Sequence, residues 1–324
     1  MQYSSIKNFL NKSLVFFKED SANYWHTITK CQISEKPNKI GKYYLDFTSK
    51  VNYPGKFNDS GIPLYSHFGQ SHIINPIVVC QYAFGLYELY IISRQGSMEY
   101  RDKFLVQADW LVENSVDWDS FGKVWHIKYD IPEYGLNSPW ISGLAQGEAI
   151  SVLTRAYEIT SDKTYISLAE KALVPFAVTV ADGGLVNRFN RYIIYEEYPS
   201  PLKTVGVLNG FIFALFGIYD LALINNSTKS QTLFNDGVHS LIKLLDYFDI
   251  DYWTNYYLFD FPKNYCSSFT YHRLVTEQIK ALHIITGKEI FNSYFKRWNF
   301  YSNRLINKLR ALGSKLFYSH KLKA

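Results

Sequence analysis

The sequence has few cysteines, no long apolar run and no dense block of basic charge in most of its length. Three of its 324 residues are cysteine, at positions 31, 80 and 266, and none belongs to a CxxC pair. Such sparse thiols argue against a structural zinc site or a disulfide framework, and they suit a reducing compartment. The apolar runs are well short of the roughly 20 residues of a membrane helix, and no cleavage site follows the lysine-bearing N-terminus. We therefore expect a cytoplasmic protein with no transmembrane segment.

Several common motifs are missing as well. The absence of GxxxxGK[ST] and GxGxxG argues against nucleotide cofactors, and the absence of GxSxG leaves nucleophilic Ser/His/Asp catalysis without support. The eight histidines are dispersed, so they form no zinc pattern. The 34 basic residues only slightly outnumber the 29 acidic ones, and they are less concentrated than in most nucleic-acid-binding proteins. We expect no organic cofactor and no nucleic-acid partner.

Aromatic residues, by contrast, are abundant. The chain has 27 Tyr, 23 Phe and 7 Trp. Tyrosine suits a wet groove, because its ring stacks while its hydroxyl group forms hydrogen bonds. A general base-composition bias that also favours Lys, Asn and Ile explains the surplus equally well, so composition alone leaves both interpretations open.

Four segments with helical patterns are nearly apolar on all faces, and each is followed by a turn and a more amphipathic helix. An amide side chain lies near the start of each apolar segment, at intervals of roughly 65 residues that predict a helical repeat. The four amides are Gln81, Gln146, Asn209 and Gln278. Apolar helices inside a ring of amphipathic ones describe an α/α toroid of about four helix pairs, with a two-helix solenoid as the rival architecture.

The joints between the helix pairs are unusually long, at about 115–142, 181–204 and 249–274. Loops of this length in a compact domain are usually functional, and all three lead into the starts of apolar helices. We therefore expect them to gather over the mouth of the toroid. Residues 1–70 differ, because alternating residues broken by Pro and Gly predict short strands and turns that pack on the helical body. Residues 71–324 form the predicted toroid domain.

The densest cluster of reactive side chains lies in the second joint, in the run Tyr195-Glu196-Glu197-Tyr198-Pro199. Proton transfer at a carbon beside a carboxylate fits these residue types, since it needs a base close to the C–H bond. A carboxylate can be that base if burial raises its pKa, and a tyrosine that keeps its proton can be an acid. The alternative interpretation is an exposed turn with a solvated carboxylate.

With these residues in place, the chain resembles the D-glucuronyl C5-epimerases, which invert C5 of glucuronate in heparosan-type chains to give iduronate. The resemblance rests on AQGEAISVLTRAY, YEEYP, VLNG and a Tyr-His pair before Gln278, and it extends over about Tyr43 to Tyr301. It implies a helical α/α barrel, in agreement with the repeat, preceded in the animal enzymes by β domains. We expect the N-terminal part of this chain to be too short for the larger β-sandwich.

The resemblance carries the family's catalytic residues onto Glu197, Tyr198, Tyr256 and Tyr271. The chain departs from the family pattern at Tyr257, where an aspartate is expected, and the arginine expected just afterwards is not obvious. We therefore expect the substrate carboxylate to be bound by other arginines. The candidates are Arg188, Arg191 and Arg273.

We further expect Trp140, Gln146 and Asn209 to bind sugar hydroxyls at the mouth, although helix packing and capping explain them equally well. His272, beside Tyr271, is a further candidate for substrate binding, and a structural role is its alternative. The animal enzymes of the family can bind calcium. Three aspartates are spaced suggestively for such an ion but are also typical of a helix C-terminus, so the metal stays unassigned. They are Asp246, Asp249 and Asp251.

These observations predict a C5-epimerase acting on uronic-acid-containing oligosaccharides, polysaccharides or their precursors. A polysaccharide lyase is one alternative, since β-elimination begins with the same proton removal. A non-catalytic glycan-binding protein with the same fold is the other. The sequence does not decide which group is acid and which is base, and it leaves a homodimer open.

Overall fold

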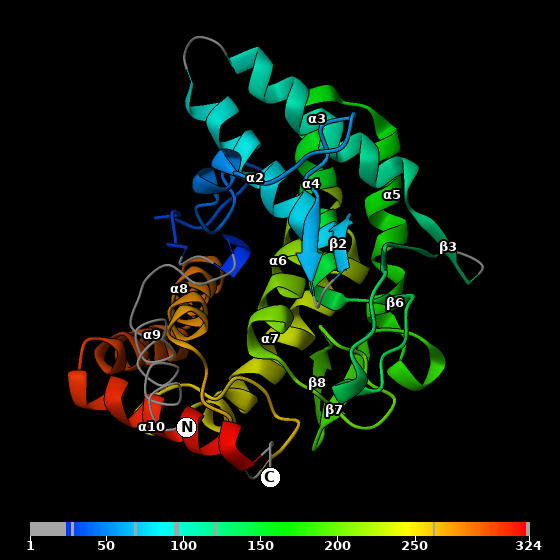
Figure 1. The fold of residues 1–324 in the computed structure, drawn as a ribbon. Helices are drawn as coiled ribbons and strands as arrows, with labels where there is room; N and C mark the ends of the chain where they lie inside the picture. The colour runs from blue at the N-terminus through cyan, green and yellow to red at the C-terminus, as the bar shows by residue number, and fades with distance from the viewer. Residues whose placement is uncertain are drawn as a thin grey trace.

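Helix pairs form most of the computed structural model, which describes residues 24–26, 29–67, 70–93, 97–119, 122–261 and 263–321. Four inner helices lie side by side, each followed by an outer helix (Figure 1). The inner helices are α2 (Pro76–Ile92), α4 (Gly143–Thr160), α6 (Leu208–Asn225) and α8 (Phe269–Thr286). The outer helices are α3 (Ser97–Glu113), α5 (Lys163–Ala172), α7 (Thr228–Phe248) and α9 (Glu289–Ser302), with α10 (Leu305–Lys321) after them. The predicted α/α toroid of four helix pairs is confirmed.

The inner helices are buried, as their apolar character predicts. Helix α6 is long and apolar enough to cross a membrane, but it lies inside the ring with 83% of its residues buried, so its apolar surface serves packing. Helices α4 and α6 approach closely through two glycines. A Cβ atom on Gly217 would lie 2.1 Å from the carbonyl oxygen of Gly147, so no side chain fits there.

Helix α8 begins earlier than the third joint was predicted to end. The hydroxyl group of Ser268 accepts a hydrogen bond from the backbone N–H of Tyr271 and caps the helix, so that Phe269 is its first residue. Tyr271 therefore lies in the first turn of an inner helix rather than in a loop.

All described strands are short and pair in antiparallel twos. Three of the four hairpins belong to the joints. Strands β3 (Val116–Trp118), β4 (Gly122–Val124), β5 (His126–Ile127) and β6 (Trp140–Ile141) lie between α3 and α4. Strands β7 (Val186–Phe189) and β8 (Tyr192–Tyr195) lie between α5 and α6. The remaining pair, β1 (Tyr65–His67) and β2 (Gln70–Ile73), precedes α2.

The three joints meet at one end of the ring, as predicted. A second hydrophobic cluster, separate from the main core, takes side chains from every joint and from the start of α4. Its buried members are Ile127, Tyr134, Leu136, Trp140, Ala145, Val205, Val207 and Tyr257. Because the joints lead into the N-termini of inner helices, this end of the ring is its mouth.

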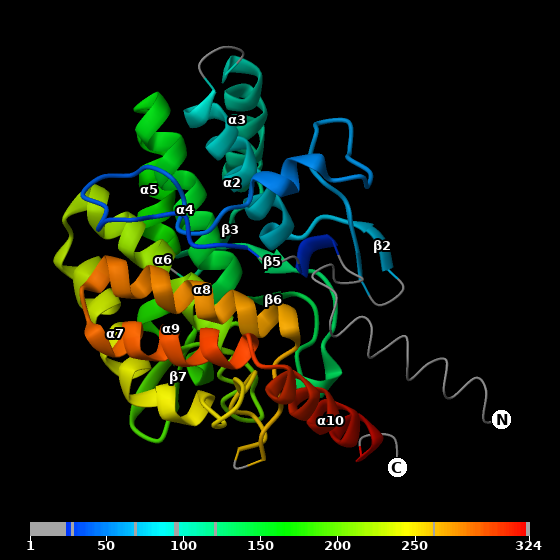
Figure 2. The same cartoon turned by 90° about the vertical axis from the view of Figure 1, so that its left-hand side faces the viewer.

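The N-terminal segment bridges the gap between the last inner helix and the first (Figure 2). The backbone N–H of Cys31 donates to Glu277 of α8 (3.0 Å), and the side chain of Gln32 donates to Glu88 of α2 (3.2 Å). The short helix η2 (Thr48–Asn52) then packs on α2. Through these contacts the N-terminal segment lies against the helical body.

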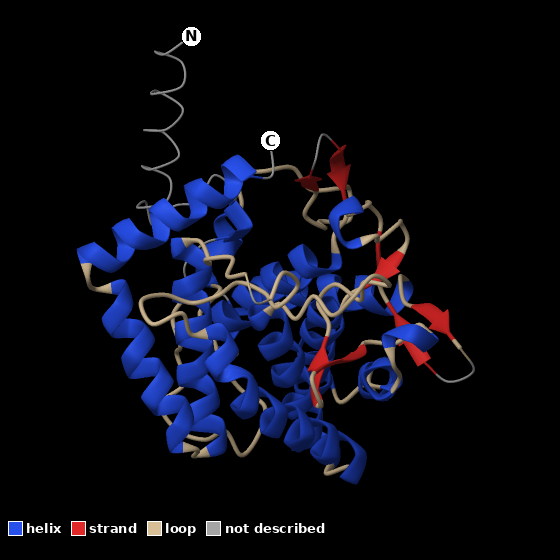
Figure 3. Ribbon diagram, turned by 90° about the horizontal axis from the view of Figure 1, so that it is seen from below, coloured by secondary structure: helices blue, strands red, loops and turns tan. Residues whose placement is uncertain are grey.

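The same segment closes the floor of the ring, at the C-terminal halves of the inner helices. There Arg155 of α4 and Asp220 of α6 form a fully buried ion pair (2.6 Å). The hydroxyl of Tyr44 donates to Asp220 (2.6 Å), and Arg155 donates to the carbonyl of Gly41 (3.1 Å). Each buried charge is therefore paired and hydrogen-bonded, as a low-dielectric interior requires. Figure 3 views the molecule from below, with the helices in blue and the short strands in red along one side.

Candidate active site

A cavity of about 270 Å³ opens at the mouth, comparable with the smallest pockets that bind small molecules, which start at about 300 Å³. Residues from every inner helix, all three joints and the N-terminal segment line it. The polar and aromatic lining includes Trp25, Thr29, Tyr65, Asn75, Gln81, Tyr129, Glu197, Tyr198, Asn209, Tyr256, Thr270 and Tyr271. A cavity of this size suits a small chemical group rather than a long stretch of polymer.

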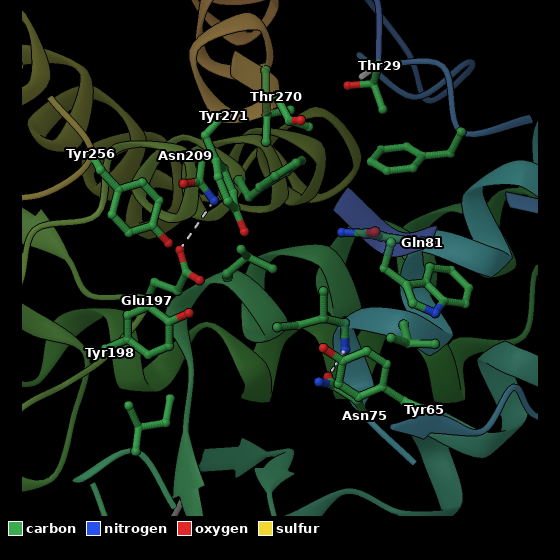
Figure 4. Close-up of a pocket in the computed structure, with 18 of the residues that line it drawn as sticks. Thr29, Tyr65, Asn75, Gln81, Glu197, Tyr198, Asn209, Tyr256, Thr270 and Tyr271 are labelled. Atoms are coloured by element: carbon green, nitrogen blue, oxygen red, sulfur yellow. Dashed lines mark hydrogen bonds between the residues drawn. The ribbon is translucent and has the colours of Figure 1, made fainter. Parts of the chain in front are cut away.

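The structure brings together the four residues that the resemblance singles out. Glu197 and Tyr198 follow β8, Tyr256 comes from the third joint, and Tyr271 comes from the first turn of α8; all four face the same cavity (Figure 4). The rings of Tyr256 and Tyr271 meet edge to face, with 5.0 Å between their centroids. Segments distant in sequence thus converge around one carboxyl group.

Glu197 is held at the start of α6. The side-chain amide of Asn209 donates to its Oε2 atom (3.3 Å), and Tyr198 also hydrogen-bonds to its carboxyl group. Gly210 lies directly behind it, where a Cβ atom would come within 2.3 Å of Oε2. Asn209 therefore supplies a hydrogen-bond donor to the Glu197 carboxyl group, and Gly210 leaves the space that this group occupies.

Burial raises the pKa of Glu197 to about 7, against the opposing effect of hydrogen bonds from Tyr198 and Asn209. A base with a pKa near neutrality is well matched to proton abstraction at physiological pH. Burial, the Glu197 charge and the neighbouring phenols raise the pKa values of Tyr198 and Tyr256 well above 10. The pKa of Tyr271 is raised too, by burial and then by Glu197. At neutral pH the site thus holds one carboxyl group that can accept a proton and three phenols that keep theirs.

Glu196 has a structural role. Its carboxyl oxygens accept hydrogen bonds from the backbone N–H groups of Val205 (3.0 Å) and Gly206 (2.9 Å), which ties the second joint into a closed loop. Its own carbonyl accepts from the N–H of Gly143 at the start of α4 (2.8 Å). Both carboxyl groups of the Glu196-Glu197 pair are buried, so the interpretation of this run as an exposed turn is wrong.

Of the predicted sugar-binding residues, only Asn209 lines the cavity. Gln146 lies in the core, where its amide donates to the carbonyls of Lys123 (2.6 Å) and Ala172 (3.0 Å) and ties α4 to the outer layer. Trp140 lies behind the wall, packed on Tyr198 and donating to the carbonyl of Tyr129 (2.7 Å). These two residues support the site instead of lining it.

His272 is fully buried and does not line the cavity. Its ring stacks on Trp253, with 3.8 Å between centroids, and its nitrogens bond to Thr254 and to the carbonyl of Trp298. Burial lowers its pKa to about 3, so the ring is neutral. Its role is to anchor α8 to the third joint, as the structural alternative predicted.

The three arginines proposed for carboxylate binding lie elsewhere. Arg188 of β7 and Arg191, in the turn between β7 and β8, line a separate surface groove. An extended strand rises about 3.3 Å per residue, and the run from Arg191 to Glu197 carries the arginine away from the cavity. Arg273 is on α8 but points to α9, where it donates to Asn299 (3.1 Å) and Ser302 (3.2 Å). No Lys or Arg is among the described residues that line the cavity.

The opposite wall of the cavity was not predicted. Tyr65, Asn75 and Gln81 lie across from Glu197 in Figure 4, and Trp25 lines the same cavity. Asn75 is the N-cap of α2, accepting a hydrogen bond from the N–H of Ile77 (2.9 Å) ahead of a proline at the first helical position. This Asn-Pro start of a helix is a sequence signal that could have placed Asn75 at the mouth. Trp25 and Tyr65 carry no comparable signal.

The suggestive aspartates at the end of α7 bond to protein donors. Asp249 accepts hydrogen bonds from Arg297 (3.1 Å), Trp298 (3.2 Å) and Tyr301 (3.2 Å), and Tyr294 donates to Asp246. Within the described part of the chain, no group of three or more His, Cys, Asp or Glu side chains is arranged to hold a metal ion. Asp246 and Asp249 thus join α7 to α9.

Comparison with known proteins adds an independent line of evidence. The sequence profile of the D-glucuronyl C5-epimerase C-terminus matches residues 119–300, a segment that contains Glu197, Tyr198, Tyr256 and Tyr271. The D-glucuronyl C5-epimerase of Caenorhabditis elegans is 33% identical over 221 residues, which cover 63% of this chain and 35% of that protein. An uncharacterized protein of Methanocaldococcus jannaschii is 31% identical over 179 residues, covering 54% of this chain and 56% of that one. The chain thus matches about a third of the worm enzyme's length and just over half of the archaeal protein's.

Among solved structures, the cellobiose 2-epimerase of Bacillus thermoamylovorans has a similar fold. The TM-score is 0.54 at 12% sequence identity, over 77% of this chain and 66% of that one. At this identity the likeness concerns the fold, and it agrees with the toroid described above.

Proposed function

The chain belongs to the D-glucuronyl C5-epimerase C-terminal domain family, and on that premise we propose that it inverts C5 of D-glucuronate residues to L-iduronate in a glycan or glycan precursor. The observation that carries the proposal is Glu197: a buried carboxyl group with a pKa of about 7, beside three protonated phenols in one cavity. This arrangement provides a base and several acids around the space for one sugar residue.

The proposed reaction has two proton transfers. Glu197 takes the proton from C5, and the electron pair of the broken C–H bond delocalises onto the adjoining C6 carboxylate. Tyr271 then returns a proton to C5 from the other face, and the electron pair forms the new C–H bond. Inversion needs two groups, since the proton must return on the face opposite to its removal. Tyr256 hydrogen-bonds to Tyr271 and would orient its hydroxyl group.

We propose that neutral donors, rather than an arginine, bind the substrate carboxylate. The hydroxyl and amide groups that line the cavity, such as those of Asn75 and Thr270, can donate hydrogen bonds to it. The inner helices also direct their N-termini toward the mouth, and a helix N-terminus carries a partial positive charge that favours an anion. Together these donors would stabilise the negative charge that grows on the carboxylate in the transition state.

The proposal is tested by incubating the purified protein with glucuronate-containing oligosaccharides in heavy water and following C5 by NMR. We expect deuterium at C5 of newly formed iduronate, with no shortening of the chain. Glu197→Gln should abolish the exchange, whereas the matched control Glu170→Gln, at an exposed carboxylate, should leave it unchanged. Absence of exchange across a panel of such oligosaccharides would overturn the proposal.

The same experiment separates epimerisation from β-elimination. A lyase would expel the C4 oxygen after proton removal, giving shorter chains with an unsaturated end that absorbs in the ultraviolet. The phenols near Glu197 could protonate such a leaving group, so the chemistry of the site alone does not distinguish the two reactions. Family membership favours epimerisation.

The cytoplasm is the setting that we propose for this activity. The three cysteines are free thiols, in keeping with a reducing compartment. Detection of the tagged protein in the soluble and membrane fractions of a lysed cell, against markers of each compartment, tests this location.

A further inference from the structure

The positive charge of the protein is concentrated at its C-terminal end. Residues 290–324 contain no Asp or Glu and eight basic residues: Lys296, Arg297, Arg304, Lys308, Arg310, Lys315, Lys321 and Lys323. The rest of the chain has 26 basic and 29 acidic residues, a net charge of −3. The overall charge of +5 therefore conceals a basic segment on an otherwise slightly acidic protein.

Helix α10 in this segment presents an apolar face to solvent. Leu305, Ile306 and Leu309 are 68%, 63% and 48% exposed, and Leu309 lies four and three positions after the other two, which places it on the same side of the helix as each of them. In the next turn, Ala311 and Leu312 are buried and hold α10 to the body. Three aliphatic side chains exposed together cost free energy in water, so such a face usually marks a contact surface.

Basic side chains border this apolar face. Arg304, Lys308 and Arg310 alternate with the three aliphatic residues along the helix, and the guanidinium of Arg304 lies over the ring of Phe300 (4.5 Å), which is itself exposed. An exposed apolar stripe flanked by Lys and Arg is typical of helices that lie in the headgroup region of an anionic bilayer.

The helix lies at the mouth end of the ring. The ammonium of Lys308 is 4.9 Å from the ring centroid of Phe269, the residue before Thr270 and Tyr271, which line the cavity. The guanidinium of Arg310 packs on Tyr252 of the third joint (4.0 Å). Figures 1 and 2 show α10 at the edge of the molecule, outside the ring of helices. A surface that bound α10 would thus lie close to the cavity.

From the charge, the exposed face and its position, we propose that α10 docks the protein onto an anionic lipid bilayer, with the Leu305, Ile306 and Leu309 side chains entering the headgroup region. A second copy of the chain fits this face poorly, because the two basic segments would repel each other. An anionic glycan would pair with the basic residues but would leave the aliphatic face exposed to water. A bilayer with acidic headgroups matches both features.

The test is cosedimentation of the full-length protein with vesicles of phosphatidylcholine alone and of phosphatidylcholine mixed with phosphatidylglycerol. We expect binding to the mixed vesicles only, weakening as salt is raised. The variant Leu305→Ser/Ile306→Ser/Leu309→Ser and the variant Arg304→Glu/Lys308→Glu should each lose at least about tenfold in apparent affinity, since both the apolar and the charged parts are required.

Two matched variants serve as controls, and they should bind like the wild type. Ile91→Ser/Ile92→Ser removes exposed aliphatic side chains at the end of α2, and Lys163→Glu/Lys171→Glu reverses exposed charges on α5. Thermal melting shows whether each variant is folded. The readout is independent of catalysis, so it stands even if the proposed epimerase activity fails.

Three outcomes would overturn the proposal. The first is a wild-type protein that stays in the supernatant with both kinds of vesicle. The second is unchanged binding by both α10 variants. The third is wild-type binding that a soluble polyanion abolishes while the triple Ser variant binds normally, which would identify an anionic glycan as the occupant.

Discussion

Gly210→Ala tests the position of Glu197 without changing its chemistry. The new Cβ atom would lie 2.3 Å from Oε2 of Glu197, whereas ordinary van der Waals contact begins at 3.4 Å, so the carboxyl group must move by about 1 Å. A displacement of about 1 Å in a catalytic group can reduce the rate by roughly 100-fold. We expect kcat for C5 exchange to fall by about that factor, because the base no longer reaches the C–H bond at the right distance.

The assay is the initial rate of deuterium incorporation at C5, measured by NMR with saturating substrate, together with a thermal melt to establish folding. Gly313→Ala is the matched control, since a Cβ atom there meets nothing within 4 Å. A folded Gly210→Ala protein that exchanges at the rate of the wild type would refute the assignment of Glu197 as the base in this geometry.

Four further predictions follow from buried ionisable groups. First, kcat/KM should rise with pH up to about 7, the pKa of Glu197, and then level off, because the phenols keep their protons well beyond that range; a pH–rate profile checks this. Second, burial raises the folded-state pKa of Glu197 from 4.5 to about 7, so its contribution to stability is fully present below about pH 4.5 and is lost as the pH rises through 7. The change in unfolding free energy caused by Glu197→Gln, relative to the wild type, should therefore be more favourable at pH 8 than at pH 4, by about 3 kcal/mol at most. An equal effect of the substitution in urea titrations at both pH values would contradict this. Third, Glu196→Ala should cost about 2–5 kcal/mol, because two buried N–H groups lose their acceptor; chemical denaturation measures the loss. Fourth, Arg155→Met should cost about 3–5 kcal/mol, because it leaves Asp220 buried and unpaired, and a smaller loss in the double variant Arg155→Met/Asp220→Leu would support this reason.

The architecture could be predicted because it depends on periodic, local patterns. Four apolar segments at a near-constant spacing predict four buried helices, and the structure has them as α2, α4, α6 and α8. The sequence pattern predicts a start of α8 that is about five residues too late. The first turn of this helix is rich in aromatic residues, and its cap depends on one side chain, Ser268. Boundaries of this kind depend on single hydrogen bonds, which periodicity does not register.

The site was predicted only in part, because it is built from segments far apart in the chain. Glu197 and Tyr198 belong to a short dense run, and the family resemblance adds Tyr256 and Tyr271. The prediction that Arg188 and Arg191 line the cavity is wrong, because closeness to Glu197 in sequence does not determine where a side chain lies in space. The β7–β8 hairpin carries Arg191 away from the cavity.

Other parts of the site depend on tertiary packing. Gln146 has the same place in the sequence repeat as Asn209, but its side chain lies in the core and donates hydrogen bonds to two backbone carbonyl groups. Trp25 and Tyr65 reach the cavity because the N-terminal segment bridges α8 and α2, an arrangement that no local pattern encodes.

The most direct test of the central claim compares exchange with inversion in the Tyr271→Phe variant, by NMR at C5 in heavy water. If Glu197 removes the proton and Tyr271 returns one from the opposite face, the variant should exchange deuterium into glucuronate while forming almost no iduronate. The matched control Tyr192→Phe, outside the cavity, should do both at the rate of the wild type. Iduronate formation by Tyr271→Phe at the wild-type rate would contradict the account.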